Sequence, residues 1–433
     1  MGARRSVAWI ILQQFFLIGF GVLQTAIVSR ALGPTGRGIL YFNMTLAGTI
    51  PMFLLGGMHL ANTYYLGTGK ADRNTVLSNT LWYGLFMGLF GVILHFGIYK
   101  LYGQEVVEAL TLQQKLAFAS ITFFVVQNSL WSGVLLAEER FGRRTLTTLL
   151  PSAIYLGFVV PMFIKGDLDF YWIVVFTVMS QIVGAGMAIL FSLPFRILLP
   201  SWKTLKPVLV FGSVPFIADL LQWSVYRADT YFLGVQRPPA DLGLYAVAQG
   251  LGEMLWIVPG AVSAVLLPLQ TKREESAQTP LTLMACRIHF TIVLFLAVFM
   301  AGFAIPIIRI VFSAPFVGAA NPLWWLIPGC VIAVIPKTLW TEFGARGRYG
   351  ICLKAAAFAC GMNLLLNYPL IERFGTAGAA LATTVSYLVG ALIQMVEYRK
   401  MTGARWSEFF LPSREDFEVA ILAPLRRVVS RSD

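Results

Sequence analysis

Residues 207–235, PVLVFGSVPFIADLLQWSVYRADTYFLGV, are long and apolar enough to cross a membrane, yet they include Asp219, Arg227 and Asp229. A bilayer core about 30 Å thick needs roughly 20 mostly apolar residues in a helix, because a helix leaves no backbone polar group unpaired in hydrocarbon. A charged side chain at the centre of such a helix costs about 2.5 to 3.5 kcal/mol. We therefore expect these charges to face protein or a water-filled cavity.

Eleven further stretches have the same apolar character as residues 207–235. The twelve expected transmembrane helices cover residues 7–29, 39–66, 77–99, 116–137, 147–164, 171–194, 207–235, 243–268, 288–313, 321–345, 351–371 and 376–397. Of the 433 residues 57% are hydrophobic and 12% are charged, whereas a soluble domain has about 25% charged residues. The composition excludes a soluble enzyme and predicts an all-α polytopic membrane protein.

Basic residues are distributed unevenly over the predicted loops. The two termini and the loops on their side of the membrane hold 23 Lys and Arg residues, and the opposite loops hold 7. Because cytoplasmic loops are enriched in Lys and Arg, we expect both termini to lie in the cytoplasm. The net charge of +12 then reflects membrane orientation, and no nucleic-acid partner is expected.

The chain matches itself when it is shifted by slightly more than 200 residues. Leu40, Tyr41, Gly48 and Gly56 fall on Leu244, Tyr245, Gly252 and Gly260, and residues 180–185 fall on 386–391. Six helices per half is an even number, so the halves are expected to be parallel copies, an arrangement typical of transporters whose bundles rock around a central site.

Three regions follow from this repeat. We expect an N-terminal six-helix bundle in residues 1–200, a C-terminal six-helix bundle in residues 201–400, and a basic cytoplasmic tail in residues 401–433. The tail has two open interpretations, a helix on the inner leaflet and a solvated segment. Pro51 with Gly56-Gly57, and Pro259-Gly260 in the other half, have two open interpretations: breaks at which helices bend during gating, and sites of close helix packing.

Polar side chains of residues 207–235 fall on one side of the predicted helix. At 100° per residue, one sector of about 100° contains Asp219, Gln222, Tyr226, Asp229 and Thr230, with Arg227 next to it. Glu253 and Lys337 add charges to the eighth and tenth helices. Two interpretations stay open: a binding site for substrate and ions, and internal salt bridges such as Arg227 with Asp229 or Glu253.

The sequence lacks the usual motifs of catalysis and of metal binding. Gly69-Lys70 is followed by Ala71 and so does not form a Walker phosphate loop. The four cysteines have no metal-ligand spacing and are expected to be packing thiols. We therefore expect no enzymatic activity, no metal and no cofactor other than a coupling H⁺ or Na⁺.

Three stretches resemble the polysaccharide transporter family of the multidrug, oligosaccharidyl-lipid and polysaccharide (MOP) exporter superfamily, which includes the O-antigen and exopolysaccharide flippases. They are SRALGPTGRG at residues 29–38, Asp229 with Leu233-Gly234 and Gly243-Leu244-Tyr245, and Asn363 and Asn367 followed by FGTAGAALAT at residues 374–383. The resemblance implies the MATE-like exporter fold, with two bundles around a cavity that opens to each leaflet in turn.

The resemblance also implies a cargo, undecaprenyl-pyrophosphate-linked oligosaccharide, moved across the bacterial cytoplasmic (inner) membrane. It implies as partners the membrane lipids, a polysaccharide polymerase and chain-length proteins. Pyrophosphate is an anion that the forked guanidinium of Arg binds well. We expect phosphate contacts from four cations: Arg30, Arg37, Arg227 and Lys337.

The remaining candidate residues are assigned to sugars and ions. Stacking and hydrogen bonds to sugars are expected from Gln222, Trp223, Tyr226 and Gln249. Asp219, Asp229 and Glu253 are expected either to bind a coupling proton or sodium ion, or to neutralise the arginines when cargo is absent.

Two other functions remain open at this point. An H⁺- or Na⁺-coupled multidrug exporter of the same superfamily would rest on an acidic cavity with few arginines. A membrane component of a polysaccharide assembly complex would have no transport activity of its own.

Overall fold

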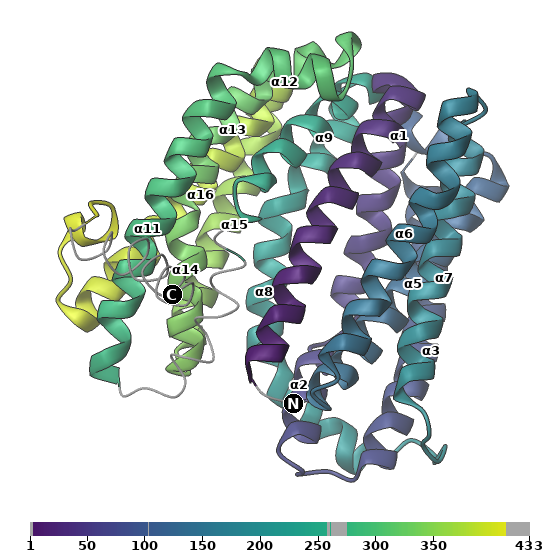
Figure 1. Cartoon of the computed structure of the whole chain (residues 1–433), viewed down its shortest axis with the longest axis vertical. Coiled ribbons are helices and arrows are strands. Elements are labelled where there is room, and N and C mark those ends of the chain that lie inside the picture. Colours follow the sequence, from purple (N-terminus) through teal and green to yellow (C-terminus); the bar gives the residue numbers. More distant parts are fainter. Residues whose placement is uncertain (1–2, 103, 258–259, 261–274, 413–433) are drawn as a thin grey trace, which may run out of the picture.

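The computed structural model describes residues 3–102, 104–257, 260 and 275–412, and within these ranges all regular structure is helical. Eight helices are long and apolar enough to cross a membrane, and one further bent pair meets the same test. Most of them run along the long axis of the molecule (Figure 1). The expected all-α membrane fold is confirmed, and twelve spans are compatible with it.

The first helix, α1 (Ala3–Leu54), consists of two helices that meet at Gly33. Gly33 has a φ of 65° and a ψ of −179°, a conformation that glycine adopts easily because it has no Cβ. In Figure 1 the chain rises along the first part of α1 and descends along the second. The predicted loop over residues 30–38 is therefore wrong, because a single residue makes the turn.

The first half of the chain continues through α2 (Met58–Gly67), α3 (Arg73–Leu101), α4 (Glu105–Glu108), α5 (Leu112–Ala137), α6 (Phe141–Lys165) and α7 (Phe170–Ser192). The break predicted at Gly56-Gly57 is confirmed, since these residues have φ values of 55° and 74° and the helices on either side are bent by 51°. Pro51 stays inside α1.

The second half contains α8 (Trp202–Gln236), α9 (Pro239–Met254), α11 (Glu275–Gly302), α12 (Ala304–Val311), η1 (Ala314–Ala319), α13 (Ala320–Ile332), α14 (Val334–Ala345), α15 (Tyr349–Phe374), α16 (Thr376–Thr402) and η2 (Trp406–Phe409). The predicted ninth span begins earlier than residue 288 and breaks at Phe303. The predicted break at Pro259 and the tail beyond residue 412 lie outside the described residues.

Two glycines bring α1 and α9 into backbone contact. A Cβ on Gly38 would lie 1.8 Å from the carbonyl oxygen of Pro239, and a Cβ on Gly243 would lie 1.9 Å from that of Pro34. The contact is reciprocal. Gly38 comes four residues after Pro34, which Gly243 faces, and Gly243 comes four residues after Pro239, which Gly38 faces. Only glycine fits at both positions, so the two halves of the chain touch here.

The same end of the molecule is closed by side chains from both halves. Arg30 donates hydrogen bonds to the carbonyl oxygens of Ile310 and Val311 at the end of α12. The largest cluster of buried apolar residues also joins the halves, with Phe42 of α1, Tyr245 of α9 and other members from α5 and α13. We call this closed end, which contains Gly33, the Gly33 end.

Candidate functional site

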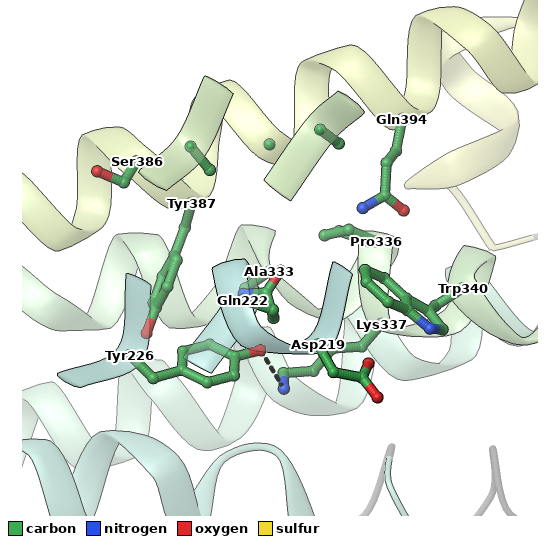
Figure 2. A pocket seen from close by; sticks show the side chains of 13 residues that line it. Asp219, Gln222, Tyr226, Ala333, Pro336, Lys337, Trp340, Ser386, Tyr387 and Gln394 are labelled. Atoms are coloured by element: carbon green, nitrogen blue, oxygen red, sulfur yellow. Dashed lines mark hydrogen bonds between the residues drawn. The ribbon is translucent and has the colours of Figure 1, made fainter. Parts of the chain in front are cut away.

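A cavity of about 220 Å³ lies within the second half of the chain (Figure 2). Its walls come from α8, α14, α15 and α16 and from the junction of α13 with α14, and its polar and aromatic members are Asp219, Gln222, Tyr226, Lys337, Trp340, Ser386, Tyr387 and Gln394. Helical spacing explains the α8 wall, because residues three to four apart share one face. The first three residues of the polar sector predicted for this helix, Asp219, Gln222 and Tyr226, therefore line a cavity.

Lys337 is held in the cavity by aromatic side chains. Its Nζ donates a hydrogen bond of 2.8 Å to the Tyr226 hydroxyl, and lies 4.1 Å from the ring centroid of Trp256. Cation–π contacts of this kind stabilise an ammonium group by about 0.5 to 2 kcal/mol. Among the described residues Lys337 has no carboxylate within ion-pair distance, and Asp219, which lines the same cavity, does not pair with it. The cavity thus presents a cation and an anion to the same space, as Figure 2 shows.

Arg227 connects the two halves of the chain. Its Nη1 lies 2.9 Å from Oε1 of Glu253 on α9 and 3.2 Å from the Tyr41 hydroxyl on α1. Its guanidinium carbon also lies 5.3 Å from the ring centroid of Trp223. Of the two salt bridges considered from the sequence, the structure therefore contains the one with Glu253.

Tyr41 contacts two arginines and a glutamine. Its hydroxyl accepts from Arg227 and donates to Oε1 of Gln249, whose Nε2 donates to the Tyr226 carbonyl at 2.7 Å. The guanidinium carbon of Arg37 lies 6.0 Å from the Tyr41 ring centroid, and the buried Nε of Arg37 has no hydrogen-bond partner among the described residues. Arg37 is half-buried, and a partly desolvated cation without a carboxylate partner is costly, so an anion bound here would stabilise Arg37.

A groove of about 340 Å³ separates the first part of α1 from the second half of the chain. Gly21, Val22 and Thr25 line one side, and the other side is lined by Gly250, Glu253, Met254 and Ile257. The carboxylate that pairs with Arg227 therefore also lines an opening between the two halves.

Six predicted site residues line neither the cavity nor the groove: Arg37, Trp223, Arg227 and Gln249, whose contacts are given above, and Arg30 and Asp229. Arg30 is exposed and bonds to the end of α12. Asp229 is fully buried, and accepts hydrogen bonds from the Tyr245 hydroxyl, from the Thr383 hydroxyl at 3.2 Å and from the Thr230 backbone N–H at 2.7 Å. Its carboxylate thus joins α8, α9 and α16.

Replacing Asp229 with alanine is expected to lower the thermal stability of the purified protein by several degrees. The hydroxyls of Tyr245 and Thr383 would lose their acceptor, and a buried polar group left unpaired costs about 1 to 3 kcal/mol. Asp229→Asn keeps one acceptor oxygen and should cost less. The measurement is the unfolding midpoint in detergent, and equal midpoints for the alanine variant and the parent would contradict a structural role.

Sequence reasoning missed three aromatic residues of this region. Tyr41, Trp256 and Tyr387 were not named as site residues, although they contact Arg227, Lys337 and the Tyr226 ring respectively. The repeat did mark Tyr41 and its counterpart Tyr245 as matching positions. Tyr245 binds Asp229, so the repeat marked two tyrosines that bond to charged residues of α8 without revealing these partners.

Comparison with protein families gives a match over most of the chain. The model described as "Polysaccharide biosynthesis protein" matches residues 16–321 of the chain.

Three relatives match the chain, and the names of two of them refer to a glycan flippase or an O-antigen transporter. A Haloferax volcanii protein provisionally named a low-salt glycan biosynthesis flippase is 22% identical over 45% of this chain and 42% of its own length. An uncharacterized membrane protein of Methanocaldococcus jannaschii is 28% identical over 38% of this chain and 33% of its own. A Shigella flexneri protein provisionally named an O-antigen transporter is 20% identical over 86% of this chain and 92% of its own. The chain thus spans less than half of the first two relatives and most of the third.

Solved structures share the fold at low sequence identity. An inward-facing MATE-family multidrug resistance transporter of the MOP superfamily has a TM-score of 0.76 at 18% identity, covering 90% of this chain and 94% of that chain. The lipid II flippase MurJ in an inward closed conformation has a TM-score of 0.72 at 15% identity, covering 90% and 87%. An outward-facing MATE-family transporter scores 0.66 at 18% identity, covering 93% and 96%. These neighbours are transporters and flippases by name.

Proposed function

The chain belongs to the polysaccharide biosynthesis protein family, and from this premise we propose that it is a flippase for lipid-linked oligosaccharide. It carries an undecaprenyl-pyrophosphate-linked glycan from the cytoplasmic to the outer leaflet of a bacterial inner membrane by alternating access. Both termini lie in the cytoplasm, so the closed Gly33 end faces outward. The observation that carries the proposal is Arg227, a cation bonded to both halves of the chain.

The pyrophosphate binds between Arg227 and Arg37 in this proposal. Both guanidinium groups contact Tyr41, one at its hydroxyl and one at its ring, so a single anion can reach both. Glu253 neutralises Arg227 while the site is empty, and the incoming phosphate takes its place. Arg30 is engaged with α12 and acts at the closed end, where phosphate arrives after the halves have moved.

The lipid chain and the sugars of the cargo bind at separate sites in this proposal. The groove between α1 and α9 opens beside Glu253 and gives the lipid chain a way to stay in the bilayer while its headgroup enters. Sugars enter the cavity lined by Asp219, Gln222 and Tyr226, where aromatic rings stack on them and amides bind their hydroxyls. Partner polymerase and chain-length proteins would receive the glycan on the outer side.

The coupling ion is a proton or sodium bound at an acid that is free to change partners. Asp229 already accepts from three donors, whereas Asp219 faces the cavity and Glu253 faces the groove. We therefore assign coupling to Asp219 and Glu253, with Asp229 as a structural residue.

The Asp219→Asn variant is expected to transport at a rate that no longer responds to an imposed gradient. An amide is close in shape to the carboxylate, but it does not titrate and has no negative charge to hold a cation. The measurement compares transport into vesicles with and without a pH or sodium gradient. A variant that responds to both gradients as the parent does would remove Asp219 from the coupling step.

Reconstitution tests the proposed function directly. Purified protein in liposomes should move fluorescent lipid-linked sugar from one leaflet to the other, and a multidrug cation should not compete. Competition by cations would favour the multidrug exporter, which the three cations at the site oppose. Liposomes in which labelled lipid never moves would favour a non-transporting assembly component.

A further inference from the structure

Residues 193–201, which connect α7 to α8, form a non-helical segment that lies along α3. We call this segment the strap. Phe195 anchors it, with its ring centroid 5.6 Å from that of the buried Trp131. The strap is thus a fixed part of the first half, and the chain passes to the second half only after it ends.

Side chains of α3 satisfy the strap's backbone. The Asn74 and Asn79 side-chain oxygens accept from the N–H groups of Arg196 and Ser201 at 3.0 and 2.7 Å. Ser78 donates to the Arg196 carbonyl at 3.0 Å and accepts from the Leu198 N–H at 2.9 Å.

Two further α3 side chains extend this pattern. Trp82 donates its indole N–H to the Leu198 carbonyl at 2.9 Å, and Arg73 donates to the Pro194 carbonyl at 2.7 Å. A loop in water needs no such partners, because water supplies its hydrogen bonds. Irregular backbone at membrane depth survives only where protein groups satisfy it, so this arrangement indicates a site with little water.

The contacts also give the depth of the strap. From Arg73 to Trp82 a helix rises roughly 13 Å, and α3 is one of the helices long and apolar enough to cross a membrane. The strap therefore lies along the first third of that span, where headgroups give way to acyl chains. Tryptophan is enriched at this level of a bilayer.

The outer face of the strap and of the start of α8 combines apolar and basic side chains. Ile197, Leu199 and Trp202 are 65%, 85% and 65% exposed. Arg196, Lys203 and Lys206 are exposed beside them, and none forms an ion pair with a carboxylate of the described residues. Apolar groups that enter acyl chains, flanked by cations at headgroup level, match an anionic phospholipid.

We infer that the strap and the start of α8 form a binding surface for anionic phospholipid, with acyl chains against Ile197, Leu199 and Trp202 and the headgroup phosphate against Arg196, Lys203 and Lys206. Because the strap precedes α8 directly, lipid bound here holds the start of α8 at a fixed depth while the rest of the second half moves. The inference does not depend on the cargo.

Fluorescence quenching tests the depth. The full-length protein and its Trp202→Phe variant are placed in phosphatidylcholine vesicles whose chains carry bromine near the headgroup or near the bilayer centre. The difference between the two proteins reports Trp202, and stronger quenching by the shallow bromine is expected. Stronger quenching by the deep bromine, or quenching only by aqueous iodide, overturns the inference; the latter would point to a surface for another protein.

Lipid retention tests the charge. The triple variant Arg196→Gln, Lys203→Gln, Lys206→Gln should retain less phosphatidylglycerol when purified from mixed phosphatidylcholine and phosphatidylglycerol vesicles, by roughly fivefold for each cation removed. The matched control is Lys100→Gln, Lys165→Gln, Arg373→Gln, three exposed cations elsewhere. Equal retention by the two triple variants, measured by mass spectrometry of bound lipid, overturns the headgroup assignment.

Discussion

Replacing Arg227 with alanine is expected to reduce the transport of lipid-linked oligosaccharide to background while the protein still reaches the membrane. Arg227 is the proposed phosphate contact that touches both halves of the chain, through Tyr41 and Glu253. Loss of one partner of a hydrogen-bonded charge pair weakens binding by about 2 to 5 kcal/mol, or roughly 30-fold to several thousand-fold. The measurement is the initial transport rate in liposomes, compared with surface display of the glycan in cells.

A second variant separates binding from folding. Arg227→Ala leaves Glu253 without its partner, and an unpaired carboxylate between the halves would itself disturb the structure. Arg227→Gln with Glu253→Gln removes both charges and keeps a hydrogen-bonding pair. We expect this double variant to unfold at the parent's temperature and still not to transport. Transport at the parent's rate would mean that the ion pair only holds α8 to α9.

Much of the fold could be predicted because hydrocarbon imposes one rule on every span. A stretch of about twenty apolar residues in lipid has to satisfy its own backbone hydrogen bonds by forming a helix, so hydropathy predicts the helical class and the approximate place of the spans but not their exact bounds. The turn at Gly33 was missed for a physical reason. Hydropathy measures the length of an apolar run, and Arg30 and Arg37 interrupt that run as the charged residues of a loop would. The family model confirms the resemblance that these same residues carry.

The candidate site was less accessible to sequence reasoning. Helical periodicity placed Asp219, Gln222 and Tyr226 on one face, and they do line one cavity. Periodicity along α8 says nothing about which helix faces it, so the partner of Arg227 stayed open between Asp229 and Glu253. Whether a buried acid is free or saturated depends on donors from other helices, here Tyr245 and Thr383. No spacing along one helix encodes that.

Replacing Gly38 with alanine is expected to open the Gly33 end and to abolish transport. The added Cβ would lie 1.8 Å from the Pro239 carbonyl oxygen, where no side-chain movement can relieve the clash because the obstructing atom is backbone. The helices α1 and α9 must separate, and the state that faces the cytoplasm loses its seal. Spin labels on cysteines introduced at Thr35 and Ala240 should report a longer distance across this end in the variant.

Gly19→Ala is the matched control, because it makes the same change in α1 where a Cβ meets no atom within 4 Å. It should leave both the label distance and the transport rate at the parent's values. If Gly38→Ala lengthened the distance without affecting transport, the seal would be dispensable, and cargo would have to be excluded from the outer side by Arg30 and the α12 contact alone. If neither quantity changed, the contact between α1 and α9 would tolerate a Cβ at residue 38, and the requirement for glycine at this seal would have to be abandoned.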